Sequence, residues 1–224
     1  MELKGKVVNF LGDSITEGAG VGDIPNCRYD NYIKNEYGLK AANNYGIGGT
    51  RLAHQFSVSN NPVKDLCFCG RAYCMDKNAD IVVVYGGVND YIHGDAPFGQ
   101  KEDRYPSSFC GGVSFLMRHL KRLYPEKTIV FVTPAHCYYE GVHDYEVSKY
   151  PIKKSDAMPL IEYVKVIEEM GEEYDLPVLN LFDELGIDPN KPEDYEKYTV
   201  DGLHFNNQGQ KILAKCIADF ILSL

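Results

Sequence analysis

The sequence predicts an α/β protein, folded as a three-layer α/β/α sandwich around a five-stranded parallel sheet. Short apolar segments alternate along the chain with segments of helical periodicity, a pattern typical of parallel strands joined by right-handed helical crossovers. The clearest apolar segment, residues 81–85 (IVVVY), has no polar face, as expected of a central strand covered on both sides. No repeat or linker divides the chain, so we expect a single domain over residues 1–224.

The first elements follow in order from the N-terminus. Residues 6–11 are predominantly apolar and end abruptly at Gly12, which is typical of a buried strand that breaks into a tight turn. Residues 27–37 have the composition of a helix and are followed by Gly38, a common residue at a helix C-terminus. A second and weaker strand is expected at residues 39–44.

The middle of the chain contains the strongest strand and a clear amphipathic helix. Residues 51–78 are ambiguous, although a helix is expected somewhere within residues 62–76. The strand at residues 81–85 comes next. Residues 107–124 place Phe, Val and Leu on one face, and Pro125 ends this helix.

The last third repeats the alternation. Strands are predicted at residues 128–133 and 177–181, because both segments are short and apolar. Residues 156–174 form an amphipathic helix with glutamates on its outer face. Asn206 or Asn207 caps the final helix, which is apolar on one face.

Composition limits the classes of partner. The 224 residues carry a net charge of −9 with a pI of about 5.1, which argues against nucleic acid, because phosphate binding needs clustered Lys and Arg. No segment resembles a transmembrane span. The first strand begins almost at once, so we expect no signal segment, no membrane association and a cytoplasmic location, with secretion of a chain that has lost its leader as the alternative. The oligomeric state stays open.

The seven cysteines are expected to be free thiols, since their number is odd and the chain is too large to need disulfides. Cys67, Cys69 and Cys74 form a C-x-C-x4-C cluster. Zinc sites usually combine C-x2-C pairs with a second pair or with histidines at matching spacing, and none follows here. We therefore expect no metal site.

Small and polar residues follow the predicted strands at three places: Gly12 to Ser14, Gly48 to Thr50, and Gly87 to Asp90. The carboxyl ends of parallel strands lie along one edge of a sheet, where open α/β proteins bind their ligands. Ser14 would also face a helix N-terminus, which favours developing negative charge. Ser14 is therefore a candidate nucleophile, and a helix N-cap is the alternative interpretation of this serine.

Asp201 and His204 are three residues apart, just before the last helix. At this spacing the carboxylate can hold one ring nitrogen while the other nitrogen faces a nucleophile. His54, His93 and His119 have no partner that the sequence reveals.

Four blocks in this order resemble the SGNH, or GDSL-type, hydrolase family. They are Gly12-Asp13-Ser14-Ile15, Asn44-x4-Gly49, Gly87-Val88-Asn89-Asp90 and Asp201-x-x-His204, and together they span nearly the whole chain. The resemblance implies the flavodoxin-like SGNH hydrolase fold and a serine esterase that needs no metal or organic cofactor. Residue by residue, it implies Ser14 as nucleophile, His204 as base and Asp201 as its partner. The implied oxyanion hole consists of the backbone N–H groups of Ser14 and Gly49 with the Asn89 side chain.

The expected substrate is a small acyl ester with a short, preferably acetyl, group on a carbohydrate; lysophospholipids and thioesters are the alternative acyl substrates that the resemblance allows. Three loops, at residues 91–106, 134–154 and 183–200, are expected to form the pocket rim, and their tyrosines could stack on sugar rings or simply cover apolar surface. Asp13 is expected to buttress the turn, with a metal ligand and a substrate contact as the alternative roles. The candidate substrate-binding residues are Asp13, Tyr91, His136, Tyr138 and Tyr139.

Two other classes of protein compete with an esterase. Gly18-x-Gly20-x-Gly22 suggests a dinucleotide-binding loop, but its spacing is not G-x-G-x-x-G and it lies several residues past the strand end. A catalytically silent carbohydrate-binding protein on the same fold is the second alternative. The presence of Ser14, Asp201 and His204 argues against it.

Overall fold

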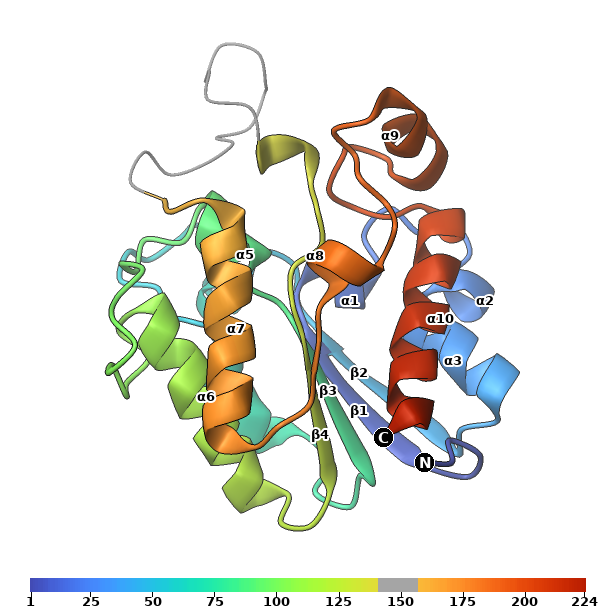
Figure 1. Ribbon diagram of the computed structural model, residues 1–224, viewed down its shortest axis with the longest axis horizontal. Helices are drawn as coiled ribbons and strands as arrows, with labels where there is room; N and C mark the ends of the chain where they lie inside the picture. Colours follow the sequence, from blue (N-terminus) through green and yellow to red (C-terminus); the bar gives the residue numbers. More distant parts are fainter. Residues whose placement is uncertain (141–156) are drawn as a thin grey trace.

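Five parallel strands form one sheet in the order β2-β1-β3-β4-β5 (Figure 1). The computed structural model describes residues 1–140 and 157–224. The strand order is that of flavodoxin-like sheets, in which ligands bind outside the carboxyl ends of the strands, so the predicted fold class is confirmed. The strands are β1 (Val7–Gly12), β2 (Ala41–Gly46), β3 (Ile81–Tyr85), β4 (Thr128–Val132) and β5 (Val178–Leu179).

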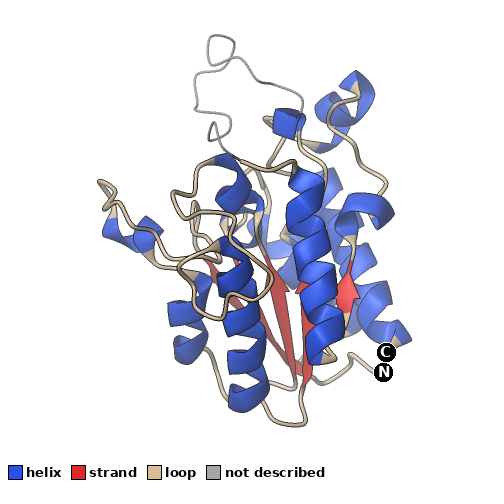
Figure 2. Ribbon diagram, turned by 60° about the vertical axis from the view of Figure 1, so that its left-hand side comes forward, coloured by secondary structure: helices blue, strands red, loops and turns tan. Residues whose placement is uncertain are grey.

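Long helices cover both faces of the sheet (Figures 1 and 2). Helices α6 (Phe109–Leu123) and α7 (Leu160–Tyr174) pack together on one face, and α3 (Tyr29–Tyr37) packs with α10 (Asn207–Ser223) on the other. All residues of strand β3 are apolar because the strand is covered on both faces. Val82 and Val84 contribute to the core under α6 and α7, whereas its alternate residues contribute to the core under α3 and α10.

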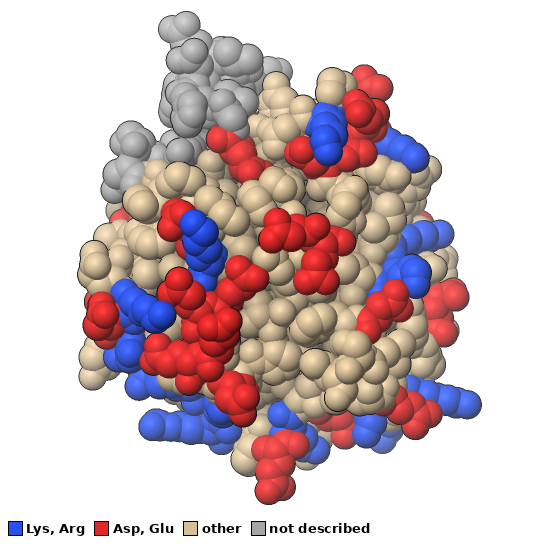
Figure 3. All heavy atoms as spheres, in the orientation of Figure 1, with Lys and Arg blue, Asp and Glu red and all other residues tan. Residues whose placement is uncertain are grey.

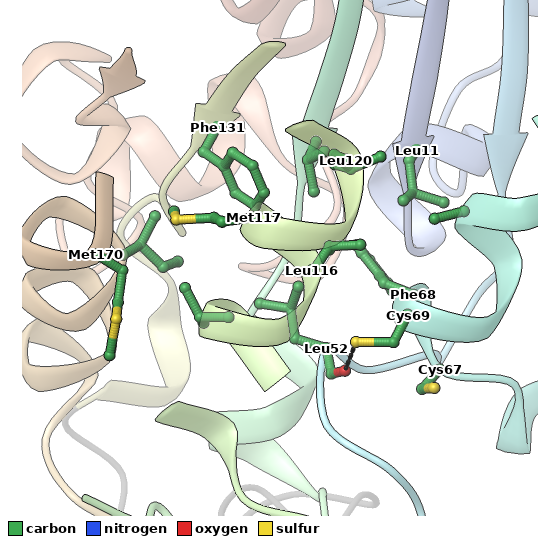
Figure 4. Packing of buried hydrophobic residues seen from close by; sticks show 14 of the residues in the cluster. Leu11, Leu52, Cys67, Phe68, Cys69, Leu116, Met117, Leu120, Phe131 and Met170 are labelled. Carbon is green, nitrogen blue, oxygen red and sulfur yellow. Dashed lines mark hydrogen bonds between the residues drawn. The ribbon is translucent and has the colours of Figure 1, made fainter. Parts of the chain in front are cut away.

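The core under α6 is drawn in Figure 4. Leu116 and Leu120 on α6 belong to the same buried cluster as Leu11 and Phe131 of the sheet. Cys69 lies in this cluster, where its thiol donates to the Leu52 carbonyl at 3.5 Å.

All seven cysteines are free thiols, and the three clustered cysteines do not share one environment. Cys67 and Cys69 are buried, while Cys74 is exposed. Within residues 1–140 and 157–224, no group of three or more His, Cys, Asp or Glu side chains could hold a metal ion.

Short helices occupy several segments that the sequence pattern predicts as irregular. The loop predicted at 183–200 contains α9, and the segment after the third strand contains α5. α9 buries none of its residues, so it has no apolar periodicity from which a helix could be inferred. The short helices are α1 (Ser14–Glu17), α2 (Ile24–Cys27), α4 (Phe68–Arg71), α5 (Val88–Ile92), α8 (Leu181–Glu184) and α9 (Pro192–Tyr198), and the 3₁₀ turns are Pro62–Asp65, Ala72–Cys74 and Tyr138–Glu140.

Several boundaries also differ from the sequence prediction: β2 lies at residues 41–46 instead of 39–44, and the helix predicted at 27–37 is divided between α2 and α3. The helix predicted at 156–174 begins at Leu160, while residue 156 itself lies outside the described part of the chain. The strand predicted at 177–181 is reduced to β5, because the Asn180 side chain accepts from the Asp183 N–H and starts α8 there. The part of the predicted loop 134–154 beyond residue 140 also lies outside the described residues.

Acidic side chains gather on the face over α7, in keeping with the glutamates predicted on its outer side (Figure 3). No helix in the described part of the chain is long and apolar enough to cross a membrane.

Candidate active site

The carboxyl end of β1 turns sharply into α1 and thereby presents Ser14. A side chain at Gly12 would clash with Thr16, because its Cβ would lie 1.9 Å from Thr16 Oγ1. Asp13 is the N-cap of α1, and its Oδ1 accepts from the Ile15 N–H at 3.0 Å. Ser14 is thus the first residue of the helix, not its cap, and its side chain is free for another partner.

Ser14, His204 and Asp201 form a continuous chain of hydrogen bonds. The Ser14 Oγ lies 2.8 Å from His204 Nε2, and His204 Nδ1 lies 2.7 Å from Asp201 Oδ2. The other carboxylate oxygen, Asp201 Oδ1, accepts from the N–H groups of Leu203 and His204 at 3.0 and 2.8 Å. The carboxylate is therefore fixed from two sides, with Nδ1–H donating to it and Nε2 left to accept from the serine hydroxyl.

The electrostatics of this pair suit a general base. Burial alone lowers the pKa of His204, but the hydrogen bond to Asp201 and the charge of Asp201 outweigh it and raise the pKa above its usual value. Burial raises the pKa of Asp201, but the hydrogen bonds from His204 outweigh it and lower the pKa overall. The carboxylate therefore stays ionised while the ring gains basicity.

The structure brings Gly49 and Asn89 to the same cleft as Ser14. Gly49 has φ +76°, a left-handed conformation that favours glycine, and its N–H makes no hydrogen bond with any other described residue. Asn89 Nδ2 donates to the Thr50 carbonyl at 3.0 Å, which uses one of its two hydrogens. Both groups can therefore still donate to an oxygen atom in the cleft.

The cleft that contains these residues has a volume of about 710 Å³. The side chains of Glu17, Asn61, Lys64 and His93 supply its polar lining beyond the residues above. Glu17 is fixed, because its carboxylate accepts from the Gly48 N–H at 2.9 Å. The apolar part of the lining consists of Ala19, Ile47, Val63, Ile92, Leu203 and Tyr139.

Of the five candidate substrate-binding residues, the structure places only Tyr139 in the cleft lining. Tyr91 is 1% exposed and lies beneath it, with its hydroxyl 3.4 Å from the Tyr139 carbonyl oxygen. Asp13 is also 1% exposed and caps α1, so the buttress interpretation describes it and the substrate contact does not.

The side chains of His136 and Tyr138 contact neighbouring segments and do not line the cleft. The His136 ring packs against Phe182 and its Nδ1 lies 3.1 Å from a Glu140 carboxylate oxygen. Tyr138 packs edge-on against the Tyr195 ring, in the manner of a tyrosine that covers apolar surface. Gly18, from the proposed dinucleotide loop, ends α1 in a left-handed conformation and does not open a helix.

Arg71 is a supporting residue that the sequence pattern does not reveal. It is 8% exposed, and its guanidinium donates to the carbonyl oxygens of Tyr45 and Gly12 at 2.5 and 2.9 Å. It also donates to Thr50 Oγ1 at 2.8 Å. One buried cation thus connects the ends of β1 and β2 with the glycine turn at residues 47–50. Burial lowers the pKa of Arg71 to about 10, so it stays charged at neutral pH.

Asp90 holds the segment that directly follows the glycine turn. Its two carboxylate oxygens accept from the N–H groups of Leu52 and Ala53, each at 2.9 Å. Such bonds to backbone N–H groups are typical of an aspartate that stabilises a loop.

Asp13 makes the stability of the protein depend on pH. Burial raises the pKa of Asp13 from 3.8 to about 6, so folding favours its protonated form. The resulting stabilisation is fully present below about pH 4 and is lost as the pH rises through 6, with a size of up to about 3 kcal/mol. The Asp13→Asn variant keeps the oxygen that caps α1 but carries no charge. We therefore expect its free energy of unfolding, relative to that of the unmutated protein, to be higher at pH 8 than at pH 4.5. Urea unfolding at the two pH values measures this, and an equal difference at both would contradict it.

Comparisons with known proteins identify the family of this chain. A model of the GDSL-like lipase/acylhydrolase family matches residues 10–212. A solved protein from Lactobacillus plantarum is 26% identical with a TM-score of 0.81, over 99% of each chain. A mutant acetyl-xylooligosaccharide esterase from a Geobacillus species is 21% identical with a TM-score of 0.61, over 99% of this chain and 96% of that one. An aryl esterase from M. smegmatis is 17% identical with a TM-score of 0.71, over 98% of this chain and 99% of that one.

No match was found among curated proteins. The family model nevertheless spans almost the whole chain, including all four sequence blocks. The protein therefore belongs to the GDSL-like lipase/acylhydrolase family and is a carboxylic ester hydrolase.

Proposed function

We propose that the protein is a serine esterase that removes short acyl groups, acetyl above all, from carbohydrates through an acyl-enzyme on Ser14. The observation that carries this proposal is the hydrogen-bonded chain from Ser14 to His204 to Asp201, with distances of 2.8 and 2.7 Å, at the cleft. A serine hydroxyl becomes an effective nucleophile when a base at this distance takes its proton.

In the first half of the reaction, Ser14 Oγ attacks the ester carbonyl carbon and His204 Nε2 takes the hydroxyl proton. The carbonyl oxygen becomes an oxyanion, which the N–H groups of Ser14 and Gly49 and the Asn89 amide stabilise. The tetrahedral intermediate then collapses, the bond to the alcohol oxygen breaks, and His204 gives its proton to that oxygen. The products of this half are the free alcohol and the acyl-enzyme.

Water completes the cycle by the same route. It attacks the acyl carbon while His204 Nε2 takes a proton from it, and the second intermediate releases the carboxylic acid as the proton returns to Ser14 Oγ. Asp201 keeps its charge throughout and stabilises the imidazolium in both halves.

The cleft lining supports a carbohydrate as the alcohol. Glu17, held by the Gly48 N–H, is a fixed acceptor for sugar hydroxyl groups, and Asn61 and Lys64 add donors near it. Tyr139 supplies one aromatic ring in the same lining. The structurally similar acetyl-xylooligosaccharide esterase has a substrate of this kind.

The acyl preference is tested with p-nitrophenyl esters of increasing chain length. We expect kcat/KM to be highest for the C2 to C4 esters, and we expect release of acetate from acetylated xylo-oligosaccharides. Ser14→Ala measured in parallel separates enzymatic turnover from background hydrolysis. Faster turnover of C8 to C12 esters would overturn the acetyl proposal and favour the lysophospholipase or thioesterase alternative.

A further inference from the structure

His93 lies between a buried cation and the amide assigned to the oxyanion hole. Its Nδ1 is 3.1 Å from a guanidinium nitrogen of Arg51, and its Nε2 is 3.0 Å from Asn89 Oδ1. Asn89 and His93 are four residues apart, at α5 and its C-cap, so one helical turn places the ring beside the amide. His93 also lines the cleft, but its two nitrogens are engaged by protein groups.

Arg51 determines which ring nitrogen of His93 carries the proton. A guanidinium only donates hydrogen bonds, so Nδ1 must accept and therefore has no proton. A neutral ring must then carry its proton on Nε2, which donates to Asn89 Oδ1. Although His93 is partly exposed, desolvation of the ring and the charge of Arg51 lower the pKa of His93 to about 4, which keeps the ring neutral at working pH.

Arg51 is itself held rigidly. It is 6% exposed, its second terminal nitrogen donates to the Lys64 carbonyl at 3.1 Å, and that nitrogen lies 3.8 Å from Asp65 Oδ1. The direction of donation therefore runs from Arg51 to His93 to Asn89, starting from a cation that cannot rotate away easily.

We propose that His93 is a positioning residue for the oxyanion hole, because it fixes Asn89 with its nitrogen toward the cleft and strengthens that amide as a donor. With Oδ1 occupied by His93 and one Nδ2 hydrogen occupied by the Thr50 carbonyl, the second hydrogen remains for the oxyanion. A donor at Oδ1 also polarises the amide, since hydrogen bonds in a chain strengthen one another. This inference rests on the proposed function, since it assigns Asn89 to the same reaction.

A double-mutant cycle with p-nitrophenyl acetate tests the proposal. Asn89→Ala is expected to lower kcat by about 10²–10³-fold, the usual cost of one oxyanion donor. His93→Phe, which keeps a ring and removes both nitrogens, is expected to lower kcat about 10-fold with KM unchanged, because the Thr50 carbonyl still holds Asn89. In the Asn89→Ala background, His93→Phe is expected to change kcat less than about 2-fold, because the residue through which it acts is gone.

His54→Phe is the matched control, since His54 is an exposed histidine that does not line the cleft, and we expect it to leave kcat unchanged. An equal loss from His93→Phe in both backgrounds, or no loss in either, would overturn the proposal. Thermal unfolding of each variant identifies any that fail to fold.

A second measurement is independent of turnover. Long-range ¹H–¹⁵N NMR of the unmutated protein at pH 7.5, with His93→Phe used for assignment, is expected to show the Nε2–H tautomer of His93. The Nδ1–H tautomer, or a charged ring, would overturn the proposal even in a protein that is inactive on the ester. Absence of both ester hydrolysis and Ser14 acylation in the unmutated protein, with the Nε2–H tautomer present, would instead refute the proposed function.

Discussion

Ser14→Ala is expected to lower kcat for p-nitrophenyl acetate by about 10⁵-fold or more, because removal of the nucleophile from a hydrogen-bonded triad eliminates the covalent route. The residual rate would come from the oxyanion donors and from substrate binding alone. His204→Ala is expected to cost about as much, and the double variant little more, since the two residues act as one unit.

Ser223→Ala is the matched control for this measurement. Ser223 ends α10, is exposed, and its hydroxyl donates to the Phe220 carbonyl. We expect this variant to hydrolyse the ester at the unmutated rate. A Ser14→Ala protein that folds and keeps its rate within about 10-fold would contradict the assignment of Ser14 as nucleophile.

Asp201→Asn is expected to lower kcat by about 10⁴-fold while the fold is kept, because the amide cannot hold His204 in the tautomer that accepts from Ser14. The same variant is also expected to lower the pH at which kcat/KM reaches half of its maximum. The base must be neutral, so activity is lost as the pH falls through the pKa of His204. Asp201 raises that pKa above its usual value of about 6.5, so the midpoint of kcat/KM in the unmutated protein lies above about 6.5 and falls in the variant.

A pH profile of kcat/KM from pH 5 to 9 measures both effects. Asp219→Asn serves as the control, since Asp219 is an exposed residue on α10 that pairs with Lys215. An Asp201→Asn variant with an unchanged rate and an unchanged midpoint would show that Asp201 is not the partner of His204.

Much of the fold is predictable because the sheet is buried on both faces. Strand β3 consists of buried apolar residues alone, which makes it recognisable as a central strand in the sequence. It lies at the centre of the sheet with the predicted boundaries of residues 81–85. The apolar faces of α6 and α10 are likewise visible as helical periodicity. Since the carboxyl ends of such strands share an edge, the meeting of Ser14 and Asn89 at one cleft also follows from the sequence.

The supporting residues could not be predicted in the same way. Arg71 lies on a four-residue helix in a segment without clear periodicity, and its three acceptors come from β1, β2 and the glycine turn. His93 could be paired with Asn89 only if α5 were known to be helical, because the spacing of four residues is meaningful on a helix alone. Such partners depend on tertiary packing, which a local pattern does not record.

The rim tyrosines show the limit of reasoning from composition. Tyr91 and Tyr138 occur in segments predicted to surround the pocket, but one is buried beneath Tyr139 and the other packs on Tyr195. An amphipathic ring serves equally well as a sugar platform and as packing. Only the position of the ring relative to the cleft distinguishes the two roles.

The central claim is that Ser14 is an activated nucleophile, and covalent labelling with a fluorophosphonate tests it most directly. We expect a fluorophosphonate to add one phosphonyl group to the unmutated protein, with peptide mass spectrometry locating the group on Ser14. Ser14→Ala is expected to remain unlabelled, and Asp201→Asn to react much more slowly. A folded, unmutated protein that is neither labelled at Ser14 nor able to hydrolyse an ester would contradict this claim.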